Sequence, residues 1–415
     1  MEKVESYVYE LLKDNVHVKN AVKWVCQGLF SSWPGPRKET DLKLNTRPEA
    51  FFGFHDKSPW SADGELLLAH TFEGKGVGNR WKKGASVDVS VFQGMDWRER
   101  VSVGTTRAWN WQQGSQLQWL GEDRRIVYND FRDGACVAVV QDLDSGMETL
   151  LPHPVAAVSP DGGRYASVCF ETFGRAMPGY GYAFEWTGAT SPLRPCELIV
   201  GRVEGGQELE ISLADLGSHL RSGEEAEGVD FFSHCLFSPA GNRLLFLRRQ
   251  SIPNRRLRSE MFCVDLKSHS LQRMAFQNMV SHFTWMSDDS VLAYANTESG
   301  GEGYYIADAE TGTVSNCTSR FNDRDGHPHA TPSGDRVVFD TYPDRRRYQR
   351  LFLWEKATEQ SRVLARFYSP MKFWGTSRVD LHPRLRPDGQ YVSFDASFDG
   401  VRSLVTAKLP PAPRS

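Results

Sequence analysis

The sequence predicts an all-β protein, a seven-bladed β-propeller that follows a short N-terminal helical extension. Three observations support this fold class. A strand–turn–strand unit recurs along most of the chain, a second hairpin follows most copies, and helical periodicity is confined to roughly the first 40 residues. Four strands per repeat are typical of a propeller, whose blades are four-stranded sheets around a central channel.

Residues 1–40 are the predicted helical segment. Apolar side chains recur there at helical spacing and are repeatedly interrupted by charge, which predicts two short amphipathic helices. The apolar positions are Val4, Val8, Leu11, Val18, Val22, Val25 and Leu29. These helices either cap the main body or bind a membrane surface or a partner. Because no uninterrupted apolar stretch occurs, we expect neither a signal peptide nor a membrane span.

The predicted propeller occupies residues 41–415. The stretch "SPWSADGELLLAH" recurs as "AVSPDGGRYASVCF", "LFSPAGNRLLFL", "TWMSDDSVLAYA", "ATPSGDRVVFD" and "RLRPDGQYVSFD", with a degenerate copy in "QWLGEDRRIVYND". Hairpins such as "VVQDLDSGMETLL" follow most copies. The last unit supplies only three strands. We expect its fourth strand to come from residues 41–47, which would close the ring and leave no open sheet edge.

Composition limits the classes of partner. The 49 Lys and Arg residues nearly balance the 52 Asp and Glu residues, so no whole-molecule field attracts nucleic acid or a membrane. The seven cysteines are scattered, odd in number and without a CxxC pair, which favours reduced thiols over a disulfide framework. We therefore expect a cytoplasmic protein that does not bind nucleic acid. The sequence leaves the oligomeric state open.

Histidines recur where the innermost strand of each blade should begin. Counting back four residues from the first residue of each repeated turn gives Lys57, Gln116, Val155, His234, His282, His327 and His382. His55 and His153 precede this position by two residues, and His329 follows it by two. A single histidine there is usually a hydrogen-bonded turn residue. Four at equivalent positions in neighbouring blades favour a shared site at the mouth of the channel, although a family habit of histidine in this turn is the other interpretation.

Basic loops are expected on the same face. The loops "KGVGNRWKK" (75–83), "RRQSIPNRRLR" (248–258) and "RRRYQR" (345–350) hold 13 basic residues and no acidic one. They are either solvated loops or a positive rim that binds an anion. A long loop of the third blade adds Tyr180, Tyr182 and Trp186, which could stack on sugar rings or pack on one another.

A uronic-acid oligosaccharide would suit such a site. It offers carboxylates to the arginines and undergoes β-elimination, in which a base removes the proton at C5 and the bond to the 4-oxygen breaks. A metal or a guanidinium must neutralise the carboxylate, and histidine is a suitable base. Hydrolysis would require a pair of carboxylates. No such pair recurs at the strand entrances, where only the isolated Asp56 and Asp380 occur.

The repeats, with "SHCLFSPAG", "SHFTWMSDD" and "GHPHATPSG", resemble the oligogalacturonate lyase family. Its members are seven-bladed propellers that cleave short galacturonides with manganese as cofactor, and the SPDG units also occur in TolB-like propellers. The resemblance covers roughly residues 45–410. It implies that His234 is the proton-abstracting base and that His282, His327 and His329 are metal ligands.

The sequence differs from the family pattern at two places, and these differences leave open which group neutralises the substrate carboxylate. Arg324 stands where the family has a metal-binding glutamine, so either His382 supplies a fourth ligand or Arg324 replaces the charge of the metal. No counterpart of the family's substrate-binding arginine is found upstream of His234. As further hypotheses, Lys57 binds a carboxylate and His55 assists proton transfer or braces the ring closure. The other expected substrate-binding residues are Arg324, Arg384, Tyr180 and Arg345.

The sequence thus favours a lyase acting on a uronic-acid glycan, with a divalent metal, manganese being suspected. The alternative is a noncatalytic propeller that binds an anionic glycan or a protein partner.

Overall fold

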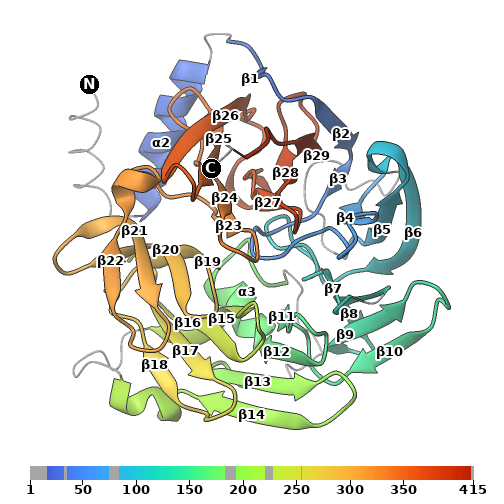
Figure 1. The fold of residues 1–415 in the computed structure, drawn as a ribbon, viewed down its shortest axis with the longest axis vertical. Coiled ribbons are helices and arrows are strands. Elements are labelled where there is room, and N and C mark those ends of the chain that lie inside the picture. The colour runs from blue at the N-terminus through green and yellow to red at the C-terminus, as the bar shows by residue number, and fades with distance from the viewer. Residues whose placement is uncertain are drawn as a thin grey trace.

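The computed structural model describes residues 16–31, 35–73, 84–122, 124–182, 193–219, 228–253 and 255–412. Seven antiparallel sheets are arranged as blades around a central channel, so the predicted fold class is confirmed (Figure 1).

The strands of each blade follow from the inside outward. Blade 1 holds β3 (Ala50–Phe51), β4 (Leu67–Thr71), β5 (Val87–Gln93) and β6 (Glu99–Thr106); blade 2 holds β7 (Gln118–Trp119), β8 (Arg125–Arg132), β9 (Ala135–Asp142) and β10 (Glu148–Leu151); blade 3 holds β11 (Ala157–Val158), β12 (Arg164–Val168), β13 (Glu197–Arg202) and β14 (Gln207–Ser212). Blade 4 holds β15 (Val229–Phe237), β16 (Arg243–Ser251), β17 (Arg258–Asp265) and β18 (Leu271–Arg273); blade 5 holds β19 (Val280–Trp285), β20 (Ser290–Thr297), β21 (Gly301–Asp308) and β22 (Val314–Asn316). Blade 6 holds β23 (His329–Ala330), β24 (Arg336–Asp340), β25 (Tyr348–Glu355), β26 (Gln360–Tyr368) and β1 (Lys38–Thr40); blade 7 holds β27 (Arg384–Leu385), β28 (Tyr391–Ala396), β29 (Ser403–Lys408) and β2 (Leu44–Pro48). The helices are α2 (Val16–Ser31) and α3 (Phe170–Ala176), with 3-10 turns at Met95–Trp97, Ala214–His219, Thr318–Arg320 and Gly375–Ser377.

The two ends of the chain meet in the seventh blade. β2 pairs with β29 from Leu44 opposite Ala407 to Pro48 opposite Ser403, so the outer strand of the last blade comes from the N-terminal part of the chain. Backbone hydrogen bonds thereby join the beginning and end of the ring (Figure 1). β1 adds a fifth strand to blade 6 by pairing with β26, which the repeat pattern did not predict.

The repeated turns explain the SPDG pattern. In the third blade the Ser159 hydroxyl accepts the Arg164 amide hydrogen at 2.9 Å, and the Asp161 carboxylate accepts that of Gly163 at 3.0 Å. Gly162 has φ +70°, a conformation that favours glycine. Side chains thus satisfy the turn's backbone groups and hold the two strands in register.

A second repeated device joins neighbouring blades. Nine residues after the first residue of the turn, four blades carry a polar side chain that bonds the backbone at the entrance of the next blade. His70 Nε2 accepts from the Ser115 amide, Asn129 Oδ1 from Val155, Asp340 Oδ2 from His382, and Asp395 from Phe52 and Gly53. These bonds position the channel-facing entrance turns relative to one another.

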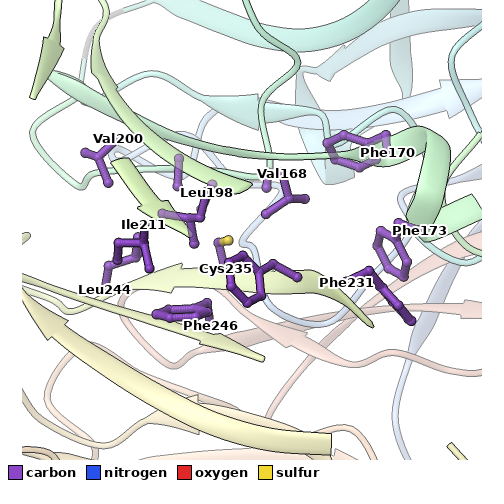
Figure 2. Close-up of a cluster of buried hydrophobic side chains, with 14 of the residues drawn as sticks. Val168, Phe170, Phe173, Leu198, Val200, Ile211, Phe231, Cys235, Leu244 and Phe246 are labelled. Atoms are coloured by element: carbon purple, nitrogen blue, oxygen red, sulfur yellow. The ribbon is translucent and has the colours of Figure 1, made fainter. Parts of the chain in front are cut away.

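The hydrophobic core lies between the blades. Figure 2 shows Val168, Leu198 and Val200 of blade 3 facing Leu244 and Phe246 of blade 4. Phe170 and Phe173 of α3 extend this cluster. Burial of both blade faces is the main stabilisation expected for this architecture.

Helix α2 is anchored to blade 6. The Gln27 amide donates to the carbonyls of Pro343 and Asp344 at 3.0 and 2.8 Å, and Gln27 Oε1 accepts from Arg347 Nη1 at 3.0 Å. The first of the two predicted helices falls on residues 1–15, outside the described residues.

All seven cysteines are free thiols. In the described part of the chain, no helix has the length and apolar character needed to cross a bilayer.

Candidate functional site

Five histidine side chains gather around one phenyl ring at the channel mouth. The Phe54 ring centroid lies 4.5 Å from that of His55, 5.1 Å from His382 and 5.2 Å from His234. The rings of His282 and His327 are each 6.0 Å away. All five histidines are at most 7% exposed, so they form a closed cluster.

Local backbone irregularities aim several of these rings. The pairing of β15 with β16 shifts register between Ser233 and Leu236, and that of β19 with β20 shifts between Val280 and Phe283. His234 and His282 lie within these bulges, which re-aim side chains at the rims of sheets. His234 also has φ +55° and His382 φ +43°, uncommon conformations for residues other than glycine.

Three donor atoms converge in the cluster. His327 Nδ1 lies 2.8 Å from Asp340 Oδ1, and its backbone amide donates to the same oxygen at 2.8 Å. With Nδ1 protonated, His327 Nε2 carries the lone pair, and this atom is buried without a hydrogen-bond partner among the described residues. His382 Nε2 and Asp380 Oδ1 are likewise buried and unpartnered. One donor atom each of His327, Asp380 and His382 lies within 4.8 Å of the others, a separation that suits a bound metal ion.

His282 is held beside this group. Its ring centroid is 4.1 Å from that of His327. Its Nδ1 lies 3.1 Å from Asp325 Oδ1, and the Ser281 hydroxyl donates to the other oxygen of Asp325 at 2.6 Å. A carboxylate thus orients this imidazole as Asp340 orients His327, the arrangement typical of metal-binding histidines.

Burial controls the charge of the cluster. It lowers the pKa of His55, His382 and His234 well below the usual value, and neighbouring positive groups add to this effect. For His327, burial also opposes the charged form, but Asp340 outweighs it and raises the pKa. Most of these rings are therefore neutral at pH 7, the form that ligates metals and accepts protons.

Six of the expected site residues lie at or beside the cluster. His234, His282, His327 and His382 all line it, and Tyr180 lies beside His234 with a ring separation of 5.9 Å. The Tyr180 hydroxyl accepts from Arg378 Nη2 at 2.8 Å. His55 Nδ1 lies 2.7 Å from the Pro328 carbonyl, a contact between blades 1 and 6 that suits the bracing role.

Other expected site residues lie differently. His329 Nδ1 accepts the Leu385 amide hydrogen at 3.2 Å, and His329 does not join the convergent donor set, a placement that does not fit the ligand role expected for it. Arg384 is fully buried, and it donates to the Gly53 carbonyl and to Asp395, both at 3.2 Å, which does not fit substrate binding. The Arg324 side chain is 52% exposed beside Asp323, a placement that does not fit the role of replacing the metal's charge inside the cluster.

The expected basic rim is less uniform than the sequence indicates. Residues 75–83 and Trp186 lie outside the described residues. Arg248 and Arg347 are buried and bonded within the fold, the latter to Ser369, Phe373 and Gln27. Arg345 is exposed. Lys57 Nζ pairs with Asp56 at 2.6 Å, which neutralises its charge.

Several residues of the site were not assigned a role by sequence reasoning. Asp380 precedes His382 by two residues and Asp325 precedes His327 by two, so a D-x-H spacing repeated in two blades was the available signal. The only sequence signal for Asp340 was its position at the end of β24, the second strand of blade 6. Phe54 and Arg249 had no signal of this kind, because an apolar residue and one arginine of a basic run are common anywhere.

Comparison with known proteins gives a fold relationship. No family model matches the chain, and no curated protein matches it. A solved structure described as oligogalacturonate lyase in complex with manganese has a TM-score of 0.60 at 14% identity, covering 92% of this chain and 99% of that one. The oligogalacturonate lyase of Vibrio parahaemolyticus has a TM-score of 0.61 at 13% identity, covering 92% and 100%. TolB from Acinetobacter baumannii, with a TM-score of 0.40, is too distant to support an argument. The chain therefore has a propeller fold similar to that of oligogalacturonate lyases.

Proposed function

We propose that this protein is a lyase that cleaves a uronic-acid-containing oligosaccharide by β-elimination, with a divalent metal at the histidine cluster. The observation that carries the proposal is the convergence of three buried, unpartnered donor atoms from His327, Asp380 and His382 beside a separate histidine, His234. The solved structure with manganese mentioned above has the same fold, and manganese is the metal we expect here.

The donor set fits a divalent cation. Two imidazole nitrogens and one carboxylate oxygen suit manganese, iron, nickel or zinc. Asp340 behind His327 supplies the outer hydrogen bond that such ligands usually have. When bound, the metal would supply positive charge that stabilises the substrate carboxylate as electron density moves onto it.

We assign the role of base to His234 as part of this proposal. Its Nδ1 is buried and has no hydrogen-bond partner in the described part of the chain, and burial keeps the ring neutral by lowering its pKa. The ring takes the proton from C5, the electron pair forms the C4–C5 double bond, and the bond from C4 to the glycosidic oxygen breaks. The leaving oxygen gains a proton from solvent. Phe54 contacts both His234 and His382, so it separates the base from the proposed ligands.

Metal analysis and product detection test this function. We expect the purified protein to contain a stoichiometric divalent metal and to release an unsaturated, ultraviolet-absorbing product from one of a panel of uronic-acid glycans. His327→Ala should lose the metal, whereas His234→Asn should keep it and lose turnover. Asn is chosen because it tolerates the positive φ of His234. His269→Asn, in an exposed turn that also has positive φ, is the control and should change neither property.

A noncatalytic role is the second candidate, and the closure of the cluster favours it. With rings at most 7% exposed, the described residues leave the histidines little contact with solvent. In that case the metal would stabilise the closed ring of blades, and the propeller would bind an anionic glycan or protein. A stoichiometric metal without any unsaturated product from the glycan panel would favour this function over the lyase.

A further inference from the structure

Among the described residues, Arg249 is a buried arginine without a carboxylate partner. It lies on β16, opposite Phe231 of β15, and is 6% exposed. Among the described residues its one hydrogen-bond contact is long, from Nη1 to the Met177 sulfur at 4.0 Å, and its Nε has no partner. Because the desolvation of a charge is costly, buried guanidinium groups are normally paired. This one lacks the pair.

The neighbouring cations show the contrast. Arg248, the preceding residue, is equally buried, but it contacts Asp230 at 2.8 Å and Glu260 at 2.7 Å. Arg378 Nε pairs with Asp380 at 2.6 Å. The fold thus supplies acidic partners for the buried Arg248 and the partly buried Arg378, whereas among the described residues Arg249 contacts only a sulfur atom.

The propeller fold does not require a cation at this position. Eleven residues after the first residue of the repeated turn, where blade 4 has Arg249, other blades carry aromatic side chains. These are Phe72 in blade 1, Phe131 in blade 2, Phe170 in blade 3 and Tyr342 in blade 6. An arginine at a position that is aromatic in four other blades indicates a local function rather than a structural role in the repeat.

Arg249 lies near the histidine cluster. It is opposite Phe231, whose ring centroid is 5.8 Å from that of Phe173, and the Phe173 ring is 5.4 Å from His234. Its charge is one of the causes that lower the pKa of His234, after burial. Burial lowers the pKa of Arg249 itself to about 10, while Tyr180, Tyr342 and Asp325 nearby act in the opposite direction. The group therefore stays charged at pH 7. Asp325 is already engaged by Ser281 and His282, so it does not serve as the partner of Arg249.

We propose that Arg249 binds the carboxylate of a uronic acid residue and holds that sugar against His234. The sugar class rests on the proposed function, but carboxylate binding itself does not require turnover. A guanidinium can form two parallel hydrogen bonds to a carboxylate, which a neutral sugar or an esterified one cannot match. Binding would also offset the positive charge that disfavours protonation of His234.

Calorimetric binding of trigalacturonate and of its methyl ester tests the proposal, with the metal-loaded full chain. We expect the acid to bind and the ester, which has nearly the same shape without charge, to bind far more weakly. Arg249→Met should weaken binding of the acid by about 10–100-fold, the loss expected for a charge-assisted contact. Arg249→Lys should lie between, because it keeps the charge and loses the planar fork. Arg98→Gln, which removes an exposed arginine with no assigned role, should bind like the wild type.

Thermal unfolding without sugar separates binding from folding. Because Arg249 has no acidic partner, Arg249→Met should be at least as stable as the wild type. A marked loss of stability in Arg249→Met would overturn the proposal, since Arg249 would then be structural. Equal binding of acid and ester, no binding of the acid, or wild-type affinity in Arg249→Met would do the same.

The outcomes also distinguish this inference from the proposed function. Carboxylate-dependent binding that needs Arg249, without any unsaturated product, would refute the lyase and keep the inference. Product formation by Arg249→Met with an unchanged KM would refute the inference and keep the lyase.

Discussion

Replacing Asp340 by asparagine should weaken metal binding without removing any ligand. Asp340 is fully buried, and its Oδ1 accepts both Nδ1–H and the backbone amide of His327 at 2.8 Å. Its Oδ2 accepts the His382 amide at 3.1 Å. One carboxylate therefore orients two of the three proposed ligands, from two different blades.

The magnitude follows from these three bonds. In Asp340→Asn the amide oxygen can keep both bonds to His327, but the amide nitrogen then faces the His382 amide hydrogen. One buried donor is left unsatisfied, at a cost of about 1–3 kcal/mol, and the charge-assisted character of the other bonds is lost. The reverse orientation would favour a proton on His327 Nε2 and block the ligating lone pair. For loss of such an outer hydrogen bond we expect metal affinity to fall by about 10–100-fold.

The assay is a chelator competition titration of the metal, with urea unfolding of the metal-free protein measured in parallel. Asp130→Asn is the matched control, since Asp130 is a buried carboxylate that accepts the Arg107 amide at 3.0 Å in blade 2. It should lose stability and keep wild-type metal affinity. If Asp340→Asn loses stability alone, Asp340 is only a link between blades. Unchanged affinity would refute the assignment of His327 Nε2 as a ligand atom.

Two further predictions concern the framework of the site. Gly326→Ala should destabilise the fold and weaken metal binding, because its Cβ would clash with the Asp340 backbone oxygen, beside His327. Gly217→Ala, with open space at its Cβ, is the control. Equal urea midpoints for the two variants would contradict the prediction. Burial lowers the pKa of His70 to about 4, so its ring is neutral in the folded protein over a wider pH range than in the unfolded chain. The contribution of His70 to the free energy of unfolding is complete above the unfolded pKa of 6.5. It falls by about 3 kcal/mol as the pH decreases toward 4. His70→Asn, which places in blade 1 the residue that blade 2 has at this position, should flatten the dependence of urea unfolding on pH between these values; an unchanged slope would show that His70 is not its source.

Repetition made the fold predictable. Each SPDG-like unit forms its turn with its own side chains, as Ser159 and Asp161 do, so the signal is local and is visible in one sequence. Closure by β2 followed from counting strands in the last unit. β1 could not be foreseen, since a three-residue strand has too little periodicity to distinguish it from a loop.

The histidines were predictable because the repeat converts sequence position into place. Four at equivalent entrances must approach one another in a ring of blades, and Phe54 contacts each of these four rings. The orientation of each ring was not predictable. His329 is two residues from His327, yet its Nδ1 accepts the amide hydrogen of Leu385 in the next blade. Side chains at i and i+2 share a face only within a regular strand, and His327 lies before β23 begins.

The charged residues were the least predictable part. Arg248 and Arg249 are adjacent in a basic run, but alternation along β16 sends one toward Asp230 and Glu260 and the other toward the histidines. Arg384 on β27 donates a hydrogen bond to Asp395 on the neighbouring strand β28, a residue 11 positions away in the chain. Pairing of charges depends on such tertiary neighbours, which composition and runs of like residues do not reveal.

Among the described residues, the unsatisfied polar groups of the site call for ligands of opposite charge. The donor atoms of His327, Asp380 and His382 would be satisfied by a cation, and Arg249 would be satisfied by an anion. Either ligand alone would leave one buried set of polar groups uncompensated, which is costly at low dielectric. A uronate carboxylate meeting a metal ion and a guanidinium compensates both. Metal and sugar should therefore bind cooperatively, a coupling that a purely structural histidine cluster would not produce.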